Sequence, residues 1–77
     1  MPRYFFHVMD GPASIDAEGT ELVDVAEARR EAVRTAGEML ATGECEGVLK
    51  GRPWSMQVAD ETGRLVYDLS FAATRFT

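Results

Sequence analysis

The sequence predicts an α+β domain in which one helix covers one face of a four-stranded antiparallel sheet, in the order ββαββ. Two pairs of short alternating segments, rich in aromatic and branched residues, flank a central segment. That central segment repeats apolar residues every three or four positions, as an amphipathic helix does. A chain of 77 residues has room for one core, so we expect residues 1–77 to form a single small domain.

Residues 3–9 predict the first strand and residues 18–23 a weaker second strand. The first segment is rich in aromatic residues and is followed by Asp10, Gly11 and Pro12, which favour a turn. Because strand side chains alternate, each strand presents two different sets of residues to the two faces of the sheet.

The helix begins after Asp24, a good N-cap residue with Glu27 three positions later. It ends at Thr42 and Gly43, where glycine can adopt the left-handed conformation. Its apolar stripe is rich in alanine, so the helix can lie close to the sheet; the stripe comprises Val25, Ala28, Ala32, Ala36, Met39 and Leu40.

Residues 44–53 are interpreted as a loop, and residues 54–59 and 65–71 as the third and fourth strands. Residues 60–63 between them form a hairpin turn, and the tail 72–77 is expected to fray. A right-handed crossover from the second to the third strand favours the order 2-1-3-4.

One helix can cover only one face of such a sheet. The better-patterned face should lie under the helix; it comprises Tyr4, Phe6, Val8, Leu22, Trp54, Met56, Val58, Leu65, Tyr67, Leu69 and Phe71. The second face then carries Phe5, His7, Met9 and Val66, which we predict as partner-binding residues, together with Val23 and Ala59. The alternative is that the tail with Phe76 folds over this face.

Composition excludes several classes of protein. Thirteen acidic against eight basic residues give a net charge of −5, which counts against partners held through phosphates, such as nucleic acids and anionic lipids. No apolar run is long enough to span a bilayer, and the N-terminus does not have the pattern of a signal peptide. A single cysteine cannot form an internal disulfide, so we expect a cytoplasmic protein.

No grouping of residues indicates catalysis, a cofactor or a metal. His7, the only histidine, is interpreted either as a general base or ligand, or as a strand residue packed between Phe5 and Met9. Cys45 lies between two glutamates, which favour its neutral thiol and count against a nucleophile. The acidic residues between 10 and 27 are interpreted as a solvated rim, because Pro12 and Ile15 break the pattern of a calcium loop.

The chain resembles a family of short bacterial proteins of unknown function. Members open with Met-Pro-Arg-Tyr-Phe-Phe-His and continue with Gly-x-Glu-Leu, Ala-Arg-x-Glu-Ala and a Trp-x-Met-x-Val-x-Asp-Glu-x-Gly hairpin. These pieces match Met1–His7, Gly19–Leu22, Ala28–Ala32 and Trp54–Gly63. The resemblance implies a small α+β domain and no known activity.

The sequence therefore favours a non-enzymatic interaction module. It would form a homodimer or bind another protein through the open sheet face or through a sheet edge. The alternative is a nucleic-acid-binding domain that stacks bases on Phe5 and His7 and contacts phosphates with Arg3, Arg52 and Arg64.

Overall fold

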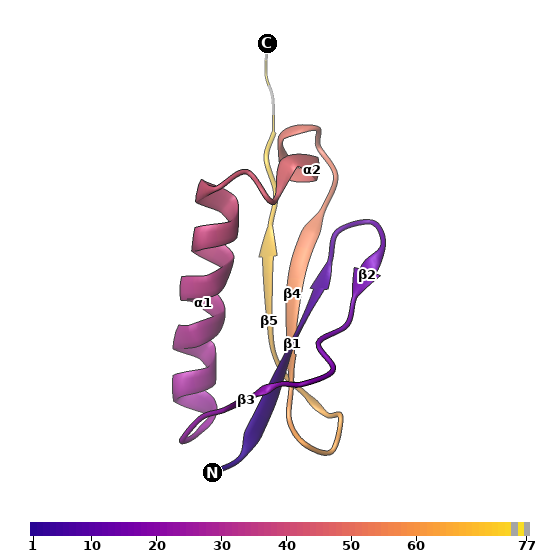
Figure 1. Ribbon diagram of the computed structural model, residues 1–77. Helices are drawn as coiled ribbons and strands as arrows, with labels where there is room; N and C mark the ends of the chain where they lie inside the picture. The colour runs from indigo at the N-terminus through magenta and orange to yellow at the C-terminus, as the bar shows by residue number, and fades with distance from the viewer. Residues whose placement is uncertain (75, 77) are drawn as a thin grey trace.

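The chain forms two layers, an antiparallel sheet and one long helix that lies against one side of it (Figure 1). The computed structural model describes residues 1–74 and 76, with residue 49 described by its backbone alone. The elements are β1 (Arg3–Met9), β2 (Ala13–Ser14), β3 (Thr20–Glu21), α1 (Val25–Ala41), α2 (Glu46–Leu49), β4 (Trp54–Ala59) and β5 (Leu65–Phe71). The predicted α+β class is confirmed.

The sheet has five strands where four were predicted. Its main path is β2-β1-β4-β5, and β3 also pairs with β1. Each pair of neighbouring strands in the predicted order 2-1-3-4 is present, with β3 in the place of the predicted second strand. The order differs in detail because β2 also pairs with β1, through Met9 and Ala13 and through Val8 and Ser14. A strand of two residues is too short to show alternation, so the sequence predicted only the turn that precedes β2.

Helix α1 begins and ends where the sequence predicts. The Asp24 side chain accepts a hydrogen bond from the Glu27 backbone N–H at 2.9 Å, and the Glu27 carboxylate accepts one from Val23. At the other end Gly43 has a φ of +85°, which suits a residue without a side chain. Local capping therefore fixes both ends of α1.

The core lies between α1 and the sheet. Ala28, Ala32 and Ala36 are fully buried, so the helix approaches the strands as closely as the alanine stripe predicts. Beneath it the largest fully buried side chains are Trp54, Met56 and Val58; Tyr4 and Leu22 are also buried, and Phe6, Val8, Tyr67, Leu69 and Phe71 pack around them. The ends of the predicted stripe, Val25 and Leu40, are exposed.

A bulge near the start of β5 corrects two predicted positions. Val58 pairs with Tyr67 while its neighbour Ala59 pairs with Leu65, so Val66 is an extra residue on β5. Val66 packs against the core, although alternation had placed it on the open face. Leu65, predicted under the helix, is instead 53% exposed.

The predicted loop 44–53 contains the short helix α2, which closes one end of the core. Cys45 and Val48 are buried there. The close fit depends on Gly47, because a Cβ at that position would lie 2.9 Å from the Asp10 Oδ1 atom. Four residues make a single turn with no repeat of apolar positions, so periodicity could not reveal this helix.

Candidate interaction surface

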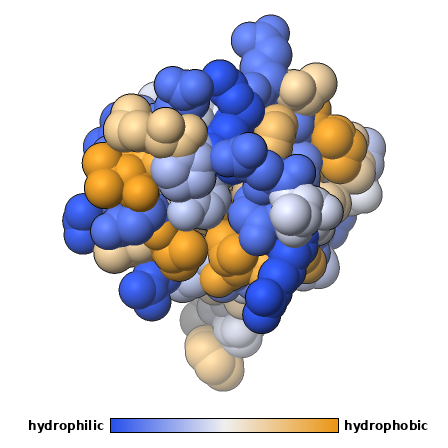
Figure 2. Space-filling view, turned by 90° about the horizontal axis from the view of Figure 1, so that it is seen from below, coloured by the Kyte–Doolittle hydropathy of each residue, from blue (hydrophilic) through white to orange (hydrophobic). Residues whose placement is uncertain are grey.

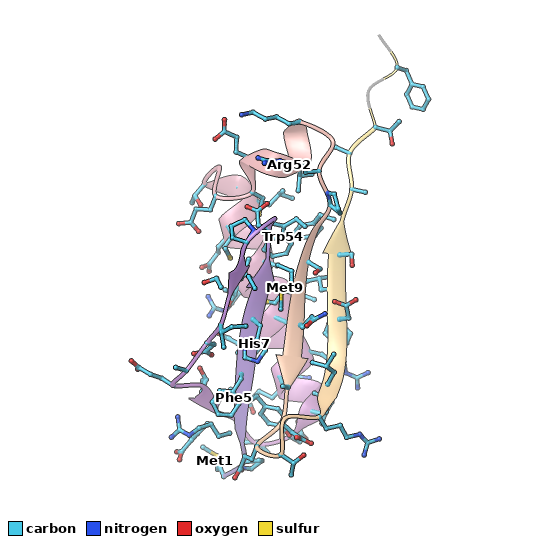
Figure 3. The ribbon with its side chains drawn as sticks, turned by 90° about the vertical axis from the view of Figure 1, so that its right-hand side faces the viewer. Met1, Phe5, His7, Met9, Arg52 and Trp54 are labelled. Carbon is cyan, nitrogen blue, oxygen red and sulfur yellow. The ribbon has the colours of Figure 1, made fainter. Side chains whose placement is uncertain are left out.

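The open face is the side of the sheet away from α1. Its residues form three rows across β1, β4 and β5. Strand register gives the rows as Phe5–Ala59–Leu65, His7–Gln57–Asp68 and Met9–Ser55–Ser70. Figure 3 shows Phe5, His7 and Met9 following one another along β1 on this side. The open face is therefore apolar at one end and polar through its middle.

Of the predicted partner-binding residues, three lie on the open face and one does not. Phe5, His7 and Met9 are half-buried there. Val66 packs against the core, and Leu65 takes its place in the row with Phe5. Leu65 was not predicted on this face because alternation carries no sign of a bulge. The short hairpin loop with Gly63, whose φ is +85° in the structure, is the nearby sequence feature that could have suggested an irregular strand start.

The apolar end of the open face lies at the end of the molecule where β1 and α1 begin. Figure 2 views this end, and its apolar residues form separate groups between hydrophilic ones. Phe76 is 92% exposed, so it does not cover the apolar residues around Leu65. The other tail positions named in that prediction, residues 75 and 77, lie outside the described residues.

Phe5 is partly covered by the segment that leads into β3. Gly19 has a φ of +72°, and a Cβ there would lie 2.9 Å from both the Phe5 ring and the Tyr4 carbonyl oxygen. Glycine thus allows this segment to cross the edge of β1 in contact with Phe5. Leu65 is the more accessible end of the row.

Asp16 holds the same segment to β1. Its carboxylate accepts backbone hydrogen bonds from Phe6, Glu18 and Gly19 at 3.0–3.2 Å. Burial raises the pKa of Asp16, but these three hydrogen bonds outweigh it and leave the pKa below the usual 3.8. This corrects the interpretation of the acidic run as only a solvated rim, since Asp16 is a structural acceptor.

His7 has a structural role in the sheet. Its ring stacks on that of Phe5, with centroids 6.5 Å apart and planes 13° apart. Its Nδ1 atom accepts a hydrogen bond from the Asp16 backbone N–H at 3.1 Å, which leaves the proton of the neutral ring on Nε2. The packing of His7 beside Phe5 agrees with the second of the two interpretations drawn from the sequence.

Cys45 is not activated as a nucleophile. Burial, followed by the charges of Asp10 and Glu44, raises the pKa of its thiol above the usual value. Of the two flanking glutamates that the sequence indicated, Glu44 contributes; the contribution of Asp10 arises only in the fold. Among the described residues, no group of three His, Cys, Asp or Glu side chains could hold a metal ion.

Among the described residues, the three arginines of the nucleic-acid alternative do not form one basic surface, and Arg64 lies in the hairpin loop, where its charge acts on Asp60. Arg3 donates to the Glu18 carbonyl and the Glu21 carboxylate, whereas Arg52 lies next to Gly47 near α2 (Figure 3). Arg29 and Arg30 lie on α1, on the other side of the sheet. The arrangement thus gives no support to the nucleic-acid alternative.

A family model described as a domain of unknown function, DUF6894, matches residues 3–72. The chain belongs to the DUF6894 family. This confirms the predicted membership of a family of unknown function. No curated protein and no solved structure matches this DUF6894 chain. Within the described residues, no helix is long and apolar enough to cross a membrane.

Proposed function

We propose that this DUF6894 domain is a non-enzymatic interaction module that associates with a second copy of itself through the open face. The observation that carries the proposal is the row Phe5–Ala59–Leu65, which strand register places across the sheet; Leu65 is exposed, Phe5 is half-buried and Ala59 is buried. Leu65 lies at the end of this row and is 53% exposed. A partner that covers it removes apolar surface from water, which favours association.

Strand register favours a second copy as the partner. A two-fold axis along β4 exchanges the β1 and β5 sides, so each β1 residue faces the β5 residue of its own row in the partner. Phe5 then meets Leu65 of the partner subunit, and His7 meets Asp68 of the partner subunit. In the first row an apolar group faces an apolar group and in the second an imidazole faces a carboxylate, whereas in the third row Met9 faces Ser70 of the partner subunit.

The perpendicular two-fold arrangement is less favourable. An axis across the strands places Asp68 opposite Asp68 of the partner subunit, with like charges in contact. The axis along β4 is therefore the arrangement we propose. We place the association in the cytoplasm, because the single cysteine is a buried neutral thiol and forms no internal disulfide.

Light scattering coupled to size-exclusion chromatography tests the proposal over a range of protein concentrations. Wild type should show twice the monomer mass of 8.5 kDa, and Leu65→Glu should show the monomer mass. Val33→Glu is the matched control, because Val33 lies on α1 and is 52% exposed, like Leu65 at 53%. Thermal melts should show that both variants remain folded.

A charge exchange tests the arrangement of the two copies. Asp68→Lys should weaken the dimer, because it places a lysine opposite His7 of the partner subunit. The double variant His7→Glu/Asp68→Lys should restore it, provided that a thermal melt of His7→Glu alone shows that the fold survives loss of the hydrogen bond from Asp16 to His7. A wild-type protein that is monomeric at every concentration would refute self-association, and a double variant no better than Asp68→Lys would refute the axis along β4.

A further inference from the structure

A pocket of about 330 Å³ lies where the end of α1, the short helix α2 and the end of β5 meet. Its walls include Leu40, Gly43, Cys45, Val48, Phe71 and Ala73. The pocket is on the helix side of the sheet and shares none of these residues with the open face. Its volume lies at the lower end of the range found for small-molecule sites.

The pocket is left open because several of the residues that line it have small side chains. Gly43 and Ala73 have little or no side chain, and Leu40, at the end of the apolar stripe, is 43% exposed. Cys45 and Val48 are buried behind the pocket. A guest would therefore bury apolar surface that folding alone leaves in contact with water.

One wall of the pocket is a fixed aromatic ring. Phe71 stacks on Trp54, with ring centroids 5.1 Å apart and planes 15° apart. Trp54 is 1% exposed, so the Phe71 ring has a fully buried stacking partner. A flat ring placed on the pocket side of Phe71 would extend this stack, an arrangement that aromatic groups favour.

The charged groups near the pocket are three carboxylates and two cations, Lys50 and Arg52, and Arg52 lies beside Asp10 at Gly47. Glu46 lines it, and the carboxylates of Asp10 and Glu44 lie near enough to act on the Cys45 thiol. Lys50 pairs with Glu46 at 3.4 Å, but both side chains are well exposed, so solvent screens this pair strongly. An anionic ligand is therefore disfavoured, and a ligand with a positive charge at the mouth is favoured.

We infer that this pocket binds the planar aromatic ring of a small molecule that carries an amine rather than an acid group. The inference is independent of the proposed self-association, because it rests on a different surface. The ring would stack against Phe71 between Leu40 and Ala73, with the ammonium group near Glu46.

Protein-observed NMR on the full chain tests the inference with two probes of the same size, 2-naphthylmethylamine and 2-naphthoate. The amine should shift the amide signals of Gly43, Cys45, Val48 and Ala73, and should bind several-fold more tightly than the acid. Ala73→Phe, which fills the pocket from an exposed position, should weaken binding of the amine at least tenfold. The matched control, Ala13→Phe on β2, should bind like wild type.

Glu46→Gln tests the charge separately from the shape. It should reduce the preference for the amine while naphthyl binding persists. Two results would overturn the inference: no shifts at the pocket amides, or equal binding by wild type and Ala73→Phe. Tighter binding of the naphthoate would overturn the assigned ligand class.

Discussion

Gly19→Ala and Gly11→Ala should differ in cost although both glycines have nearly the same backbone conformation. Their φ angles are +72° and +78°. Each substitution places an alanine in the left-handed region, which costs about 1–2 kcal/mol. At Gly11 nothing lies within 4 Å of the new Cβ, so no further cost is expected there.

At Gly19 the new Cβ also meets β1. It would lie 2.8 Å from the Arg3 Cγ atom, and 2.9 Å from the Phe5 ring and the Tyr4 carbonyl oxygen. The backbone oxygen cannot move without disturbing the strand, so overpacking adds about 1–3 kcal/mol. We therefore expect Gly19→Ala to cost about 2–5 kcal/mol in total.

Urea unfolding followed by the fluorescence of Trp54, the single tryptophan, measures both variants. The matched substitution cancels the effect of alanine on the unfolded chain, so the difference reports only the contact with β1. Equal losses of stability in the two variants would show that residue 19 does not cross β1 closely in solution.

Four further outcomes follow from the core, the cap, the acidic acceptor and the thiol. Trp54→Ala should cost about 3–5 kcal/mol, whereas Trp54→Phe should cost less, because the indole Nε1 has no hydrogen-bond partner among the described residues. Equal thermal melts for wild type and Trp54→Ala would contradict the assigned core. Asp24→Ala should lose about 1 kcal/mol and helical circular dichroism, since it removes the bond to Glu27; an unchanged melt would argue against that cap. The lowered pKa of Asp16 means that its stabilisation is complete above the usual pKa of 3.8 and is lost as pH falls through the folded pKa. The stability difference between wild type and Asp16→Asn should therefore narrow as pH falls below 3.8, and a constant difference would contradict this. Cys45 should react slowly with a thiol reagent in buffer and rapidly in urea, and fast reaction of the folded protein would contradict its burial.

The elements of the fold were predictable wherever a repeat extends over several residues. Strands β1, β4 and β5 each alternate over six or seven residues, and α1 carries three buried alanines at four-residue spacing. Of the short elements, β3 lies within the predicted strand 18–23, whereas β2 and α2 give no such signal. The two-residue strands β2 and β3 and the single-turn helix α2 form because neighbouring segments supply their hydrogen bonds and contacts.

The candidate interaction surface was predictable in part. Alternation along β1 places Phe5, His7 and Met9 on one side, and the structure has them there. The same rule fails on β5, where one extra residue exchanges Leu65 and Val66 between the faces. Register is a property of two paired strands, and neither strand alone records it.

By itself, the sequence determined the fold class, the extent of α1 and the acidic character of the chain, because periodicity, capping and charge are local or additive properties. Only the tertiary structure decided that Leu65 joins Phe5, that Asp16 holds the segment before β3, and that a pocket remains beside Phe71. Each of these depends on contacts between residues far apart in the chain, whose distances follow from the packing of the whole domain.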